Sequence, residues 1–399
     1  MSTPRVLFLD QAGVLGGAEL YLLDVARAFR DTSRVVLFEA GPFLERLRDA
    51  GIAAEAYSAP SALLNVRKTA GWGSALQALP GLARLTAQVA RTARDYDVLF
   101  ANSQKAMLVA GLAGAVARRP VVWSLHDMLT AAHFSALNRR VAVTGANWFV
   151  DRVVVNSRAT QSAFRQSGGR VDKTTVVYNG IDAAPFDAID PSDLETLRGE
   201  FDKPDAPLLG VFGRLAPWKG QHVVLEALPA LPEAHVLFVG DTLFRGDESY
   251  EETLRRTARR LDVADRVHFL GFRDDVPRLM TFVDLVLHTS VAPEPFGRVI
   301  VEAMLAGTPV LATRAGGPVE IVQEPDTGVL VPPGDPEALA TAVQDVLSSP
   351  NRARAMAQAA QAYARRRFSV EQMQKGVKEA IGEVLAPGGH PSPHCTSGQ

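Results

Sequence analysis

Two glutamates, Glu294 and Glu302, form an E-x7-E pair in a segment that leads from an apolar run into a helical pattern. Pro295 and Gly297 precede the apolar stretch 298–305, so the backbone N–H groups at its start should form an exposed helix N-terminus that favours a diphosphate. Glu302 lies one turn further along, where a carboxylate would accept hydrogen bonds from the vicinal hydroxyls of a ribose. Glu294 could do the same for a sugar. The alternative interpretation is two surface glutamates on an ordinary helix.

A cationic loop, Gly213 to Gly220, follows another apolar run, Leu208 to Phe212. Its cations are Arg214 and Lys219, and a position just after a strand would hold them above the edge of a sheet. Arginine can bind a leaving diphosphate through a forked contact, and lysine can act as a point charge. The alternative is a pair of solvated surface charges.

In the first half of the chain, a glycine-rich turn and a histidine also follow apolar runs. The turn Gly13-Val-Leu-Gly16-Gly17-Ala-Glu19 comes after Arg5 to Asp10 and lacks the G-x-G-x-x-G spacing of a dinucleotide site, which argues against a nicotinamide enzyme. Its glycines still allow a close backbone approach. His126 follows Pro120 to Leu125. A lone histidine is more often structural, and the sequence leaves open whether it orients a sugar or shares a proton.

Apolar runs alternate with helical patterns along the chain, which indicates βαβ units around parallel sheets. The predicted strands are 5–10, 34–38, 98–101, 120–125, 152–156 and 175–178 in the first half, and 208–212, 235–239, 267–270, 285–288, 309–312 and 328–331 in the second. We therefore expect an α/β fold of two doubly wound, Rossmann-like domains that face each other across a cleft, with the ligand-binding loops at the carboxyl ends of the strands.

The domain boundaries follow from composition. A stretch rich in proline and acidic residues suggests a linker, and the pair Phe368-Ser369 suggests a break before a last helix. The expected parts are an N-terminal domain over 1–183, a linker over 184–207, a C-terminal domain over 208–369, a final helix over 370–385 and a disordered tail over 386–399.

Composition excludes several classes of protein. The 399 residues carry 42 Lys plus Arg against 44 Asp plus Glu, so bulk charge does not favour nucleic-acid binding. The single cysteine, Cys395, allows neither an internal disulfide nor a cysteine metal cluster. The longest run of small apolar residues, 106–117, is too short to span a membrane, and no secretory signal is expected. The expected location is the cytoplasm, with peripheral contact to the inner face of the membrane as an open alternative.

Taken together, these segments resemble the "group 1" nucleotide-sugar glycosyltransferases, glycosyltransferase family 4, which have the GT-B fold and retain the anomeric configuration. The motifs that carry the resemblance are the E-x7-E pair, the G-R-x4-K-G loop and the sequence Glu302-Ala-Met-Leu-Ala-Gly-Thr-Pro-Val. Weaker likenesses are Val177-Tyr-Asn179-Gly-Ile-Asp182 and Ala315-Gly-Gly317-Pro-Val-Glu320. The resemblance extends over nearly the whole chain.

The resemblance implies roles for individual residues. Gly16 and Gly17 would form the floor beneath the donor diphosphate and the acceptor, and His126 would lie beside the donor sugar. The implied catalytic residues are His126, Arg214, Lys219 and Glu294. The implied donor-binding residues are Gly16, Gly17, Gly213, Phe272, Val276, Phe296, Gly297, Arg298, Val299 and Glu302. Phe272 and Val276 would frame the base.

The sequence predicts no metal. Asp95-Tyr96-Asp97 has the D-x-D pattern by which other glycosyltransferases hold a divalent ion, but it precedes a strand, at the opposite end from the ligand-binding loops. No other His, Asp and Glu cluster has metal-ligand spacing. We expect Arg214 and Lys219 to neutralise the diphosphate instead.

The predicted function is retaining transfer of a sugar from a nucleotide diphosphate sugar, with UDP favoured over GDP, to an acceptor hydroxyl in glycoconjugate or polysaccharide synthesis. The rivals are an epimerase of the same fold and a non-catalytic nucleotide-sugar sensor. No further cofactor is expected. The segment between Glu55 and Asp95 and the segment 128–150 lack acidic residues, which suits an anionic acceptor or an acidic membrane face. A solvated helix face is the alternative.

Overall fold

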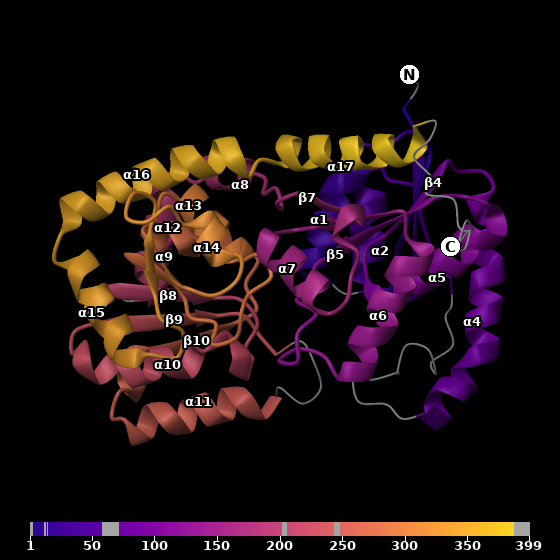
Figure 1. Ribbon diagram of the computed structural model, residues 1–399. Coiled ribbons are helices and arrows are strands. Elements are labelled where there is room, and N and C mark those ends of the chain that lie inside the picture. The colour runs from indigo at the N-terminus through magenta and orange to yellow at the C-terminus, as the bar shows by residue number, and fades with distance from the viewer. Residues whose placement is uncertain are drawn as a thin grey trace. The chain divides into compact units, whose positions relative to one another are not determined.

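Two α/β units make up the computed structural model, which describes residues 3–11, 13, 15–57, 72–201, 206–242 and 248–386 (Figure 1). The first unit comprises residues 1–180 together with 370–399, and the second comprises residues 181–369. The last helix of the chain therefore belongs to the first unit. The predicted disordered tail, apart from Ala386, lies outside the described residues.

The first unit is built on a seven-stranded parallel sheet with the strand order β3-β2-β1-β4-β5-β6-β7. Its strands are β1 (Val6–Asp10), β2 (Ser33–Leu37), β3 (Ala54–Ala56), β4 (Val98–Ala101), β5 (Val121–Leu125), β6 (Arg152–Val155) and β7 (Thr174–Val176). All residues of β1, β4 and β5 are buried, as expected for apolar strands that helices cover on both faces.

Helices cover both faces of this sheet. On one face lie α4 (Trp72–Ala93), α5 (Gln104–Ala117), α6 (Ala136–Phe149) and α7 (Arg158–Gln166), and on the other lie α1 (Gly17–Arg27), α2 (Pro42–Asp49) and α17 (Val370–Leu385). Ser103, Ser135 and Ser157 begin α5, α6 and α7 by accepting a hydrogen bond from the backbone N–H three residues on. These caps explain why the chain turns into a helix soon after each strand.

The last helix, α17, packs on the first unit through an apolar stripe. Its buried residues are Met373, Val377, Ala380, Ile381 and Val384, which recur at helical spacing. Gln374 Nε2 donates to the backbone oxygen of Asp24 at 2.7 Å, and Arg152 forms an ion pair with Glu383. The stripe and these polar contacts hold α17 on the sheet.

The second unit contains a six-stranded parallel sheet with the order β10-β9-β8-β11-β12-β13. Its strands are β8 (Leu208–Phe212), β9 (His235–Val239), β10 (Val267–Gly271), β11 (Leu285–His288), β12 (Val310–Thr313) and β13 (Val329–Val331). Its helices are α8 (Ala184–Asp187), α9 (Pro191–Phe201), α10 (Gln221–Ala227), α11 (Glu248–Arg260), α12 (Val276–Phe282), α13 (Arg298–Leu305), α14 (Pro318–Ile321), α15 (Pro336–Leu347) and α16 (Pro350–Arg367).

The segment expected to be a linker, 184–207, contains two helices among its described residues, α8 and α9, and both pack on α12. Its prolines and acidic residues fit a helix start, because proline is tolerated in the first turn and acids there favour the helix dipole. Leu197 is buried, and Phe201 lies against Phe282 at a ring distance of 6.1 Å. The segment is therefore part of the second unit.

In each sheet the strand order reverses beside the first strand of the unit. β1 lies between β2 and β4, and β8 lies between β9 and β11. Connections leave the two neighbouring strands toward opposite faces at such a switch point, so the loops at the carboxyl ends leave room for a ligand. The loops after β1 and β4 and those after β8 and β11 are therefore the places where a site is expected.

Candidate active site

The loops after β8 and β11 bring Lys219 and Glu294 into contact. Lys219 Nζ donates to both carboxylate oxygens, at 2.9 Å from Oε1 and 2.7 Å from Oε2. The Glu294 residue is only 8% exposed, so solvent and salt screen this ion pair less than a surface pair. The switch point of the second unit therefore joins the two candidate residues that the sequence placed on separate loops.

Two further side chains hold the same carboxylate. Ser290 Oγ donates to Glu294 Oε2 at 2.8 Å, and His288 Nε2 lies 3.3 Å from that oxygen. Burial opposes ionisation of Glu294, but the Lys219 ammonium and the His288 imidazole outweigh it and hold the pKa of the carboxyl well below its usual range. Within the described chain, Oε2 has three partners and Oε1 has only Lys219. Oε1 therefore retains the capacity to accept a hydrogen bond from a ligand.

Two hydrogen bonds to backbone oxygens of the Lys219 loop hold it against the loop after β11. Thr289 Oγ1 donates to the Lys219 backbone oxygen at 3.1 Å, and Val291 N–H donates to the Trp218 oxygen at 2.9 Å. Gly220 has a φ of +73°, and a Cβ there would overlap the carbonyl oxygen of Thr289. Only glycine fits this approach without strain, so the sequence Lys219-Gly220 fixes where the ammonium lies.

Arg214 lies on the same loop. Its backbone oxygen accepts a hydrogen bond from Gln221 Nε2 at 3.0 Å, and its guanidinium carbon is 5.9 Å from the centroid of the Trp218 ring. Lys219 Nζ is 4.3 Å from the same ring. Gly213 N–H donates to the backbone oxygen of Val239, which joins the start of the loop to β9. The loop thus presents two cations around one indole.

The helix α13 begins beside Glu294, as the sequence predicts. Gly297 is its N-cap residue with a φ of +102°, and no side chain caps the first turn. Arg298 Nη2 lies 3.4 Å from Glu302 Oε1, and Arg298 Nη1 is buried with no hydrogen-bond partner among the described residues. Phe296 is 2% exposed and packs edge-on against Phe368, so its ring belongs to the core and is not available to a ligand.

The base-framing candidates follow β10, at the same edge of the sheet. Phe272 is 74% exposed, and Val276 is the first residue of α12. Between them, Arg273 forms ion pairs with Asp275 at 2.7 Å and Glu200 at 2.6 Å. The Arg273 contact holds the pKa of Asp275 below its usual range despite partial burial. These pairs fix the loop that carries Phe272.

In the first unit, His126 belongs to a chain of hydrogen bonds. Asn102 Nδ2 donates to Asp10 Oδ2 at 2.7 Å and to the backbone oxygen of Ala18 at 3.0 Å. Asn102 Oδ1 therefore faces His126 Nε2, 2.9 Å away, and a carbonyl oxygen there requires the proton on Nε2. The Tyr21 ring packs edge-on against the imidazole at 4.6 Å. His126 thus has a fixed orientation and tautomer.

Glu19 lies beside this chain at the start of α1. Burial raises the pKa of its carboxyl to about 7, and the nearby Asp10 and Asp127 carboxylates add to the rise. The side chain reaches back to the glycine turn, because a Cβ on Gly16 would come within 2.8 Å of Glu19 Oε2. Backbone N–H groups of Gly16 and Glu19 act in the opposite direction on the pKa. Glu19 therefore caps the helix whose first residue is Gly17.

The D-x-D triplet lies where the sequence predicts, before β4. Asp97 Oδ2 accepts a hydrogen bond from the Arg5 backbone N–H at 2.8 Å, at the opposite edge of the sheet from His126. No group of three or more His, Cys, Asp or Glu side chains that could hold a metal ion occurs in the described part of the chain. Among the described helices, none combines the length and apolar character needed to cross a bilayer.

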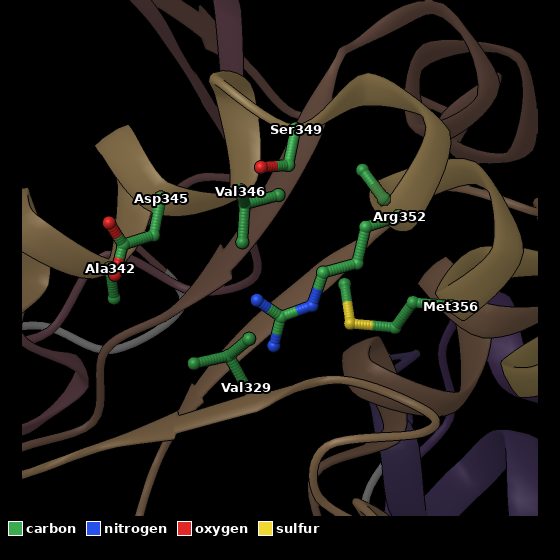
Figure 2. A pocket seen from close by; sticks show the side chains of 8 residues that line it. Val329, Ala342, Asp345, Val346, Ser349, Arg352 and Met356 are labelled. Carbon is green, nitrogen blue, oxygen red and sulfur yellow. The ribbon is translucent and has the colours of Figure 1, made fainter.

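A cavity of about 100 Å³ lies between α15, α16 and β13, which is the outermost strand on one side of the second sheet. Figure 2 shows the Arg352 side chain reaching across it toward Val329, the first residue of β13. Pockets that bind a small-molecule ligand have volumes several-fold larger than this. The cavity is too small for a nucleotide sugar and lies away from the switch point.

Several residues of the two clusters were not predicted as site residues from the sequence. They are Asp10, Glu19, Asn102, His288 and Ser290. Asp10 and His288 end predicted apolar strands, and Asn102 follows one directly, so polar residues at the last position of each strand and the position after it are the signal for all three. Glu19 stands three residues after the N-cap Gly16, which is the capping position.

The fold and the two clusters define the class of nucleotide-sugar-dependent transferases with two Rossmann-like domains. Family models match both halves: "Glycosyltransferase Family 4" matches residues 15–184, and "Glycosyl transferases group 1" matches residues 194–363. The chain belongs to this family of nucleotide-sugar glycosyltransferases and has its GT-B fold.

Anabaena HepE in complex with UDP and glucose is 43% identical, with a TM-score of 0.87 over 95% of this chain and 99% of that one. A GDP-mannose-dependent α-(1-6)-phosphatidylinositol monomannoside mannosyltransferase of Mycolicibacterium smegmatis is 32% identical over 65% of this chain and 69% of its own. The lipopolysaccharide core glycosyltransferase LpsE of Rhizobium meliloti is 35% identical over 38% of this chain, and the chain spans 43% of its length.

Proposed function

We propose that the protein transfers a hexose from a UDP-sugar to an acceptor hydroxyl, with retention of the anomeric configuration and without a metal ion. The observation that carries the proposal is the buried Glu294 carboxylate, which Lys219, Ser290 and His288 hold through Oε2. This arrangement leaves Oε1 to accept hydrogen bonds from sugar hydroxyls. In this proposal the Lys219 ammonium would also stabilise a leaving diphosphate.

The other candidate residues take roles that their positions allow. Arg214 and Lys219 would neutralise the diphosphate, and the N–H groups at the start of α13 would add hydrogen bonds to it. Glu302 would hold the ribose. Arg298, which contacts Glu302 and has an unused buried N–H group, would help to orient it.

Three further residues, which would contact the base, the sugar or the acceptor, complete the proposed assignment. Phe272, largely exposed after β10, would stack on or beside the base together with Val276. In the first unit, His126 is the candidate group for the sugar and the acceptor hydroxyl, because the hydrogen bond between its Nε2 and Asn102 Oδ1 fixes the orientation of the ring.

The proposed chemical step needs no general base from the protein. The bond between the anomeric carbon and the phosphate oxygen breaks as the acceptor oxygen bonds to the same face of that carbon. The departing phosphate oxygen takes the acceptor's proton, while Arg214 and Lys219 stabilise its charge. Electrostatic contacts of this kind typically contribute about 10²-fold to 10³-fold each to the rate.

The donor assignment rests on a relative. HepE has been crystallised with UDP-glucose and is 42% identical to this chain, so UDP-glucose is the first donor to test. The named donor of the Mycolicibacterium smegmatis relative is GDP-mannose, which makes it the matched comparison. A sugar or glycolipid acceptor, polysaccharide or glycoconjugate synthesis, a cytoplasmic location and peripheral membrane contact are parts of the same proposal.

The test is a thermal-shift and transfer assay with both donors, with and without EDTA. A ligand at 100 times its Kd stabilises the folded state by about 2.7 kcal/mol, so UDP-glucose should raise the melting temperature and GDP-mannose should not. Activity should survive EDTA. Stabilisation by GDP-mannose alone would contradict the donor assignment, and activity that only Mg²⁺ or Mn²⁺ restores would contradict metal independence. Turnover of the donor to another nucleotide sugar without acceptor would favour an epimerase, and saturable binding with neither transfer nor hydrolysis would favour a sensor.

A further inference from the structure

The helical layer formed by α4, α5 and α6 contains no acidic residue. The helices on the opposite face of the same sheet, α1, α2 and α17, contain Glu19, Asp24, Glu45, Asp49, Glu371, Glu379 and Glu383. The acid-free layer instead carries exposed arginines on its helices or directly after them. These are Arg84, Arg91, Arg94, Arg118 and Arg140. In a chain with a formal charge of -2, this is a strong local segregation of charge.

Exposed apolar side chains gather on the same layer. Of eleven large hydrophobic residues that are exposed in the described chain, six belong to these three helices: Leu79, Val116, Leu137, Val141, Trp148 and Phe149. Trp148 is the most exposed of them, at 78%. Scattered single hydrophobics on a surface are ordinary, whereas a concentration on one layer indicates an interaction site.

On α6 the exposed residues form one stripe. Leu137, Val141, Thr144 and Trp148 are all exposed and follow the i, i+4, i+7, i+11 spacing of a single helix face, and Arg140 borders them. Ala142, Val143, Gly145 and Ala146 are buried on the side toward the sheet. The stripe therefore points away from the unit's own core.

The three helices form a continuous surface. α5 packs against α4 on one side and against α6 on the other, and the three helices lie side by side in Figure 1. Gly111 and Gly145 allow the close approach of α5 and α6, because a Cβ on either would come within 3 Å of a side chain of the other helix. Two aspartates, Asp95 and Asp97, follow the end of α4, and the Asp97 carboxylate already accepts a backbone hydrogen bond from Arg5.

We propose that the outer side of α4, α5 and α6, here called the basic layer, docks the protein on an anionic lipid surface. Tryptophan and arginine together are typical of a surface that enters the headgroup region, with the apolar side chains inserted and the cations at the phosphates. A second copy of the chain is a poorer partner, because a symmetric contact would bring the same arginines against one another. An anionic bilayer provides both the apolar region and the opposite charge.

The experiment is flotation of the full chain with vesicles of phosphatidylglycerol and phosphatidylcholine in equal parts, and with vesicles of phosphatidylcholine alone. We expect binding to the first and not to the second, with a decrease as salt is raised. Arg140→Glu changes the charge by two and should lower the partition coefficient about 25-fold, since each charge near an anionic surface contributes roughly fivefold. Trp148→Ala should lower it as well. The matched control is Arg366→Glu, an exposed arginine on α16 of the second unit, which should bind as the wild type does.

Two outcomes of the flotation experiment would contradict the proposal. Failure to bind the anionic vesicles, or binding that both Arg140→Glu and Trp148→Ala leave unchanged, would overturn the proposal. A concentration-dependent dimer that Trp148→Ala dissociates, without vesicle binding, would assign the basic layer to a second copy. Because Trp148 and Arg140 are exposed, both variants should keep the wild-type melting temperature, which separates lost docking from lost folding. Transfer to a soluble acceptor should also be unchanged, so the outcome is independent of the proposed donor chemistry.

Discussion

The clusters at the two switch points lie at equivalent places in two similar sheets, yet their electrostatics are opposite. In the second unit a carboxylate, Glu294, meets the Lys219 ammonium, and its pKa lies well below the usual range. In the first unit burial raises the pKa of the Glu19 carboxyl to about 7, and the nearby Asp10 and Asp127 carboxylates add to the rise.

The difference shows how one fold can serve two tasks. A cationic loop and an uncapped helix start suit the anionic donor, and a carboxylate that lysine and histidine hold ionised is a poor base but a good hydrogen-bond acceptor. A cluster with an excess of carboxyl groups beside a histidine would suit a neutral hydroxyl instead. The predictions below test whether the two clusters differ in this way.

The largest expected effect is the loss of turnover when Lys219 is replaced. Lys219→Ala should lower turnover about 10²-fold to 10³-fold, because charge on the leaving phosphate grows in the transition state. Loss of the partner also leaves Glu294 buried without its counter-charge, which can cost about 3 to 5 kcal/mol of stability. Steady-state kinetics at saturating donor, below the melting temperature of the variant, measure the first effect.

The control for this change is Lys375→Ala, an exposed lysine on α17 whose side chain is 70% exposed. It should leave both turnover and melting temperature unchanged. Normal turnover in a folded Lys219→Ala variant would refute the role of the ammonium and remove the contrast between the two clusters.

The next effect concerns Glu19 and pH. The pKa of the Glu19 carboxyl rises on folding from its ordinary value of 4.5 to about 7. Ionisation of this carboxyl therefore disfavours the folded state, and its contribution to stability is lost as pH rises from about 4.5 through 7. Glu19→Gln should therefore raise the free energy of unfolding by about 2 to 3 kcal/mol at pH 8 and change it little at pH 4. Urea unfolding of variant and wild type at both pH values measures the difference.

Glu45→Gln is the matched control, since Glu45 is an exposed acid in the first turn of α2. Its stability relative to the wild type should not depend on pH in this way. An effect of Glu19→Gln that is equal at pH 4 and pH 8 would show that Glu19 acts only as a helix cap, with no electrostatic strain in the first cluster.

A smaller effect is expected at Gly220. Gly220→Ala would require a φ of +73° and place Cβ on the Thr289 carbonyl oxygen, so it should lower stability by about 1 to 3 kcal/mol and displace Lys219. Gly199→Ala in α9 meets no atom within 4 Å and should be neutral or stabilising by up to about 1 kcal/mol. Thermal unfolding of both variants decides, and equal stability of the two would show that the Lys219 loop is not locked.

Much of this arrangement was predictable from the sequence. The apolar runs before Gly213 and Glu294 are strands β8 and β11, and the helix start at Gly297 is where the glycine indicated it. The position of both loops at the carboxyl ends of the strands also follows from the sequence, because ligand-binding loops of parallel α/β sheets lie there. The contact between Lys219 and Glu294 did not follow, because it joins loops 75 positions apart and depends on which strands are neighbours.

Other features could not be predicted because tertiary contacts decide them. The short strand β3, Ala54–Ala56, has none of the β-branched or aromatic residues that typify strands and forms by pairing with β2. Helix α9, within the segment expected to be a linker, is stabilised because Leu197 and Phe201 pack against apolar partners. His288 belonged to an apolar run, and nothing in the spacing showed that its Nε2 faces Glu294.

The most direct test of the account is the configuration of the product. The low pKa of Glu294, with Lys219 bonded to both of its oxygens, makes it a poor general base for activating an acceptor behind the anomeric carbon. No pair of carboxylates at that switch point suggests a double displacement among the described residues. Proton NMR of the first-formed product from an α-linked donor such as UDP-glucose should therefore show an α-anomeric signal. A β-linked first product would contradict the mechanism and the role given to the Lys219 and Glu294 pair.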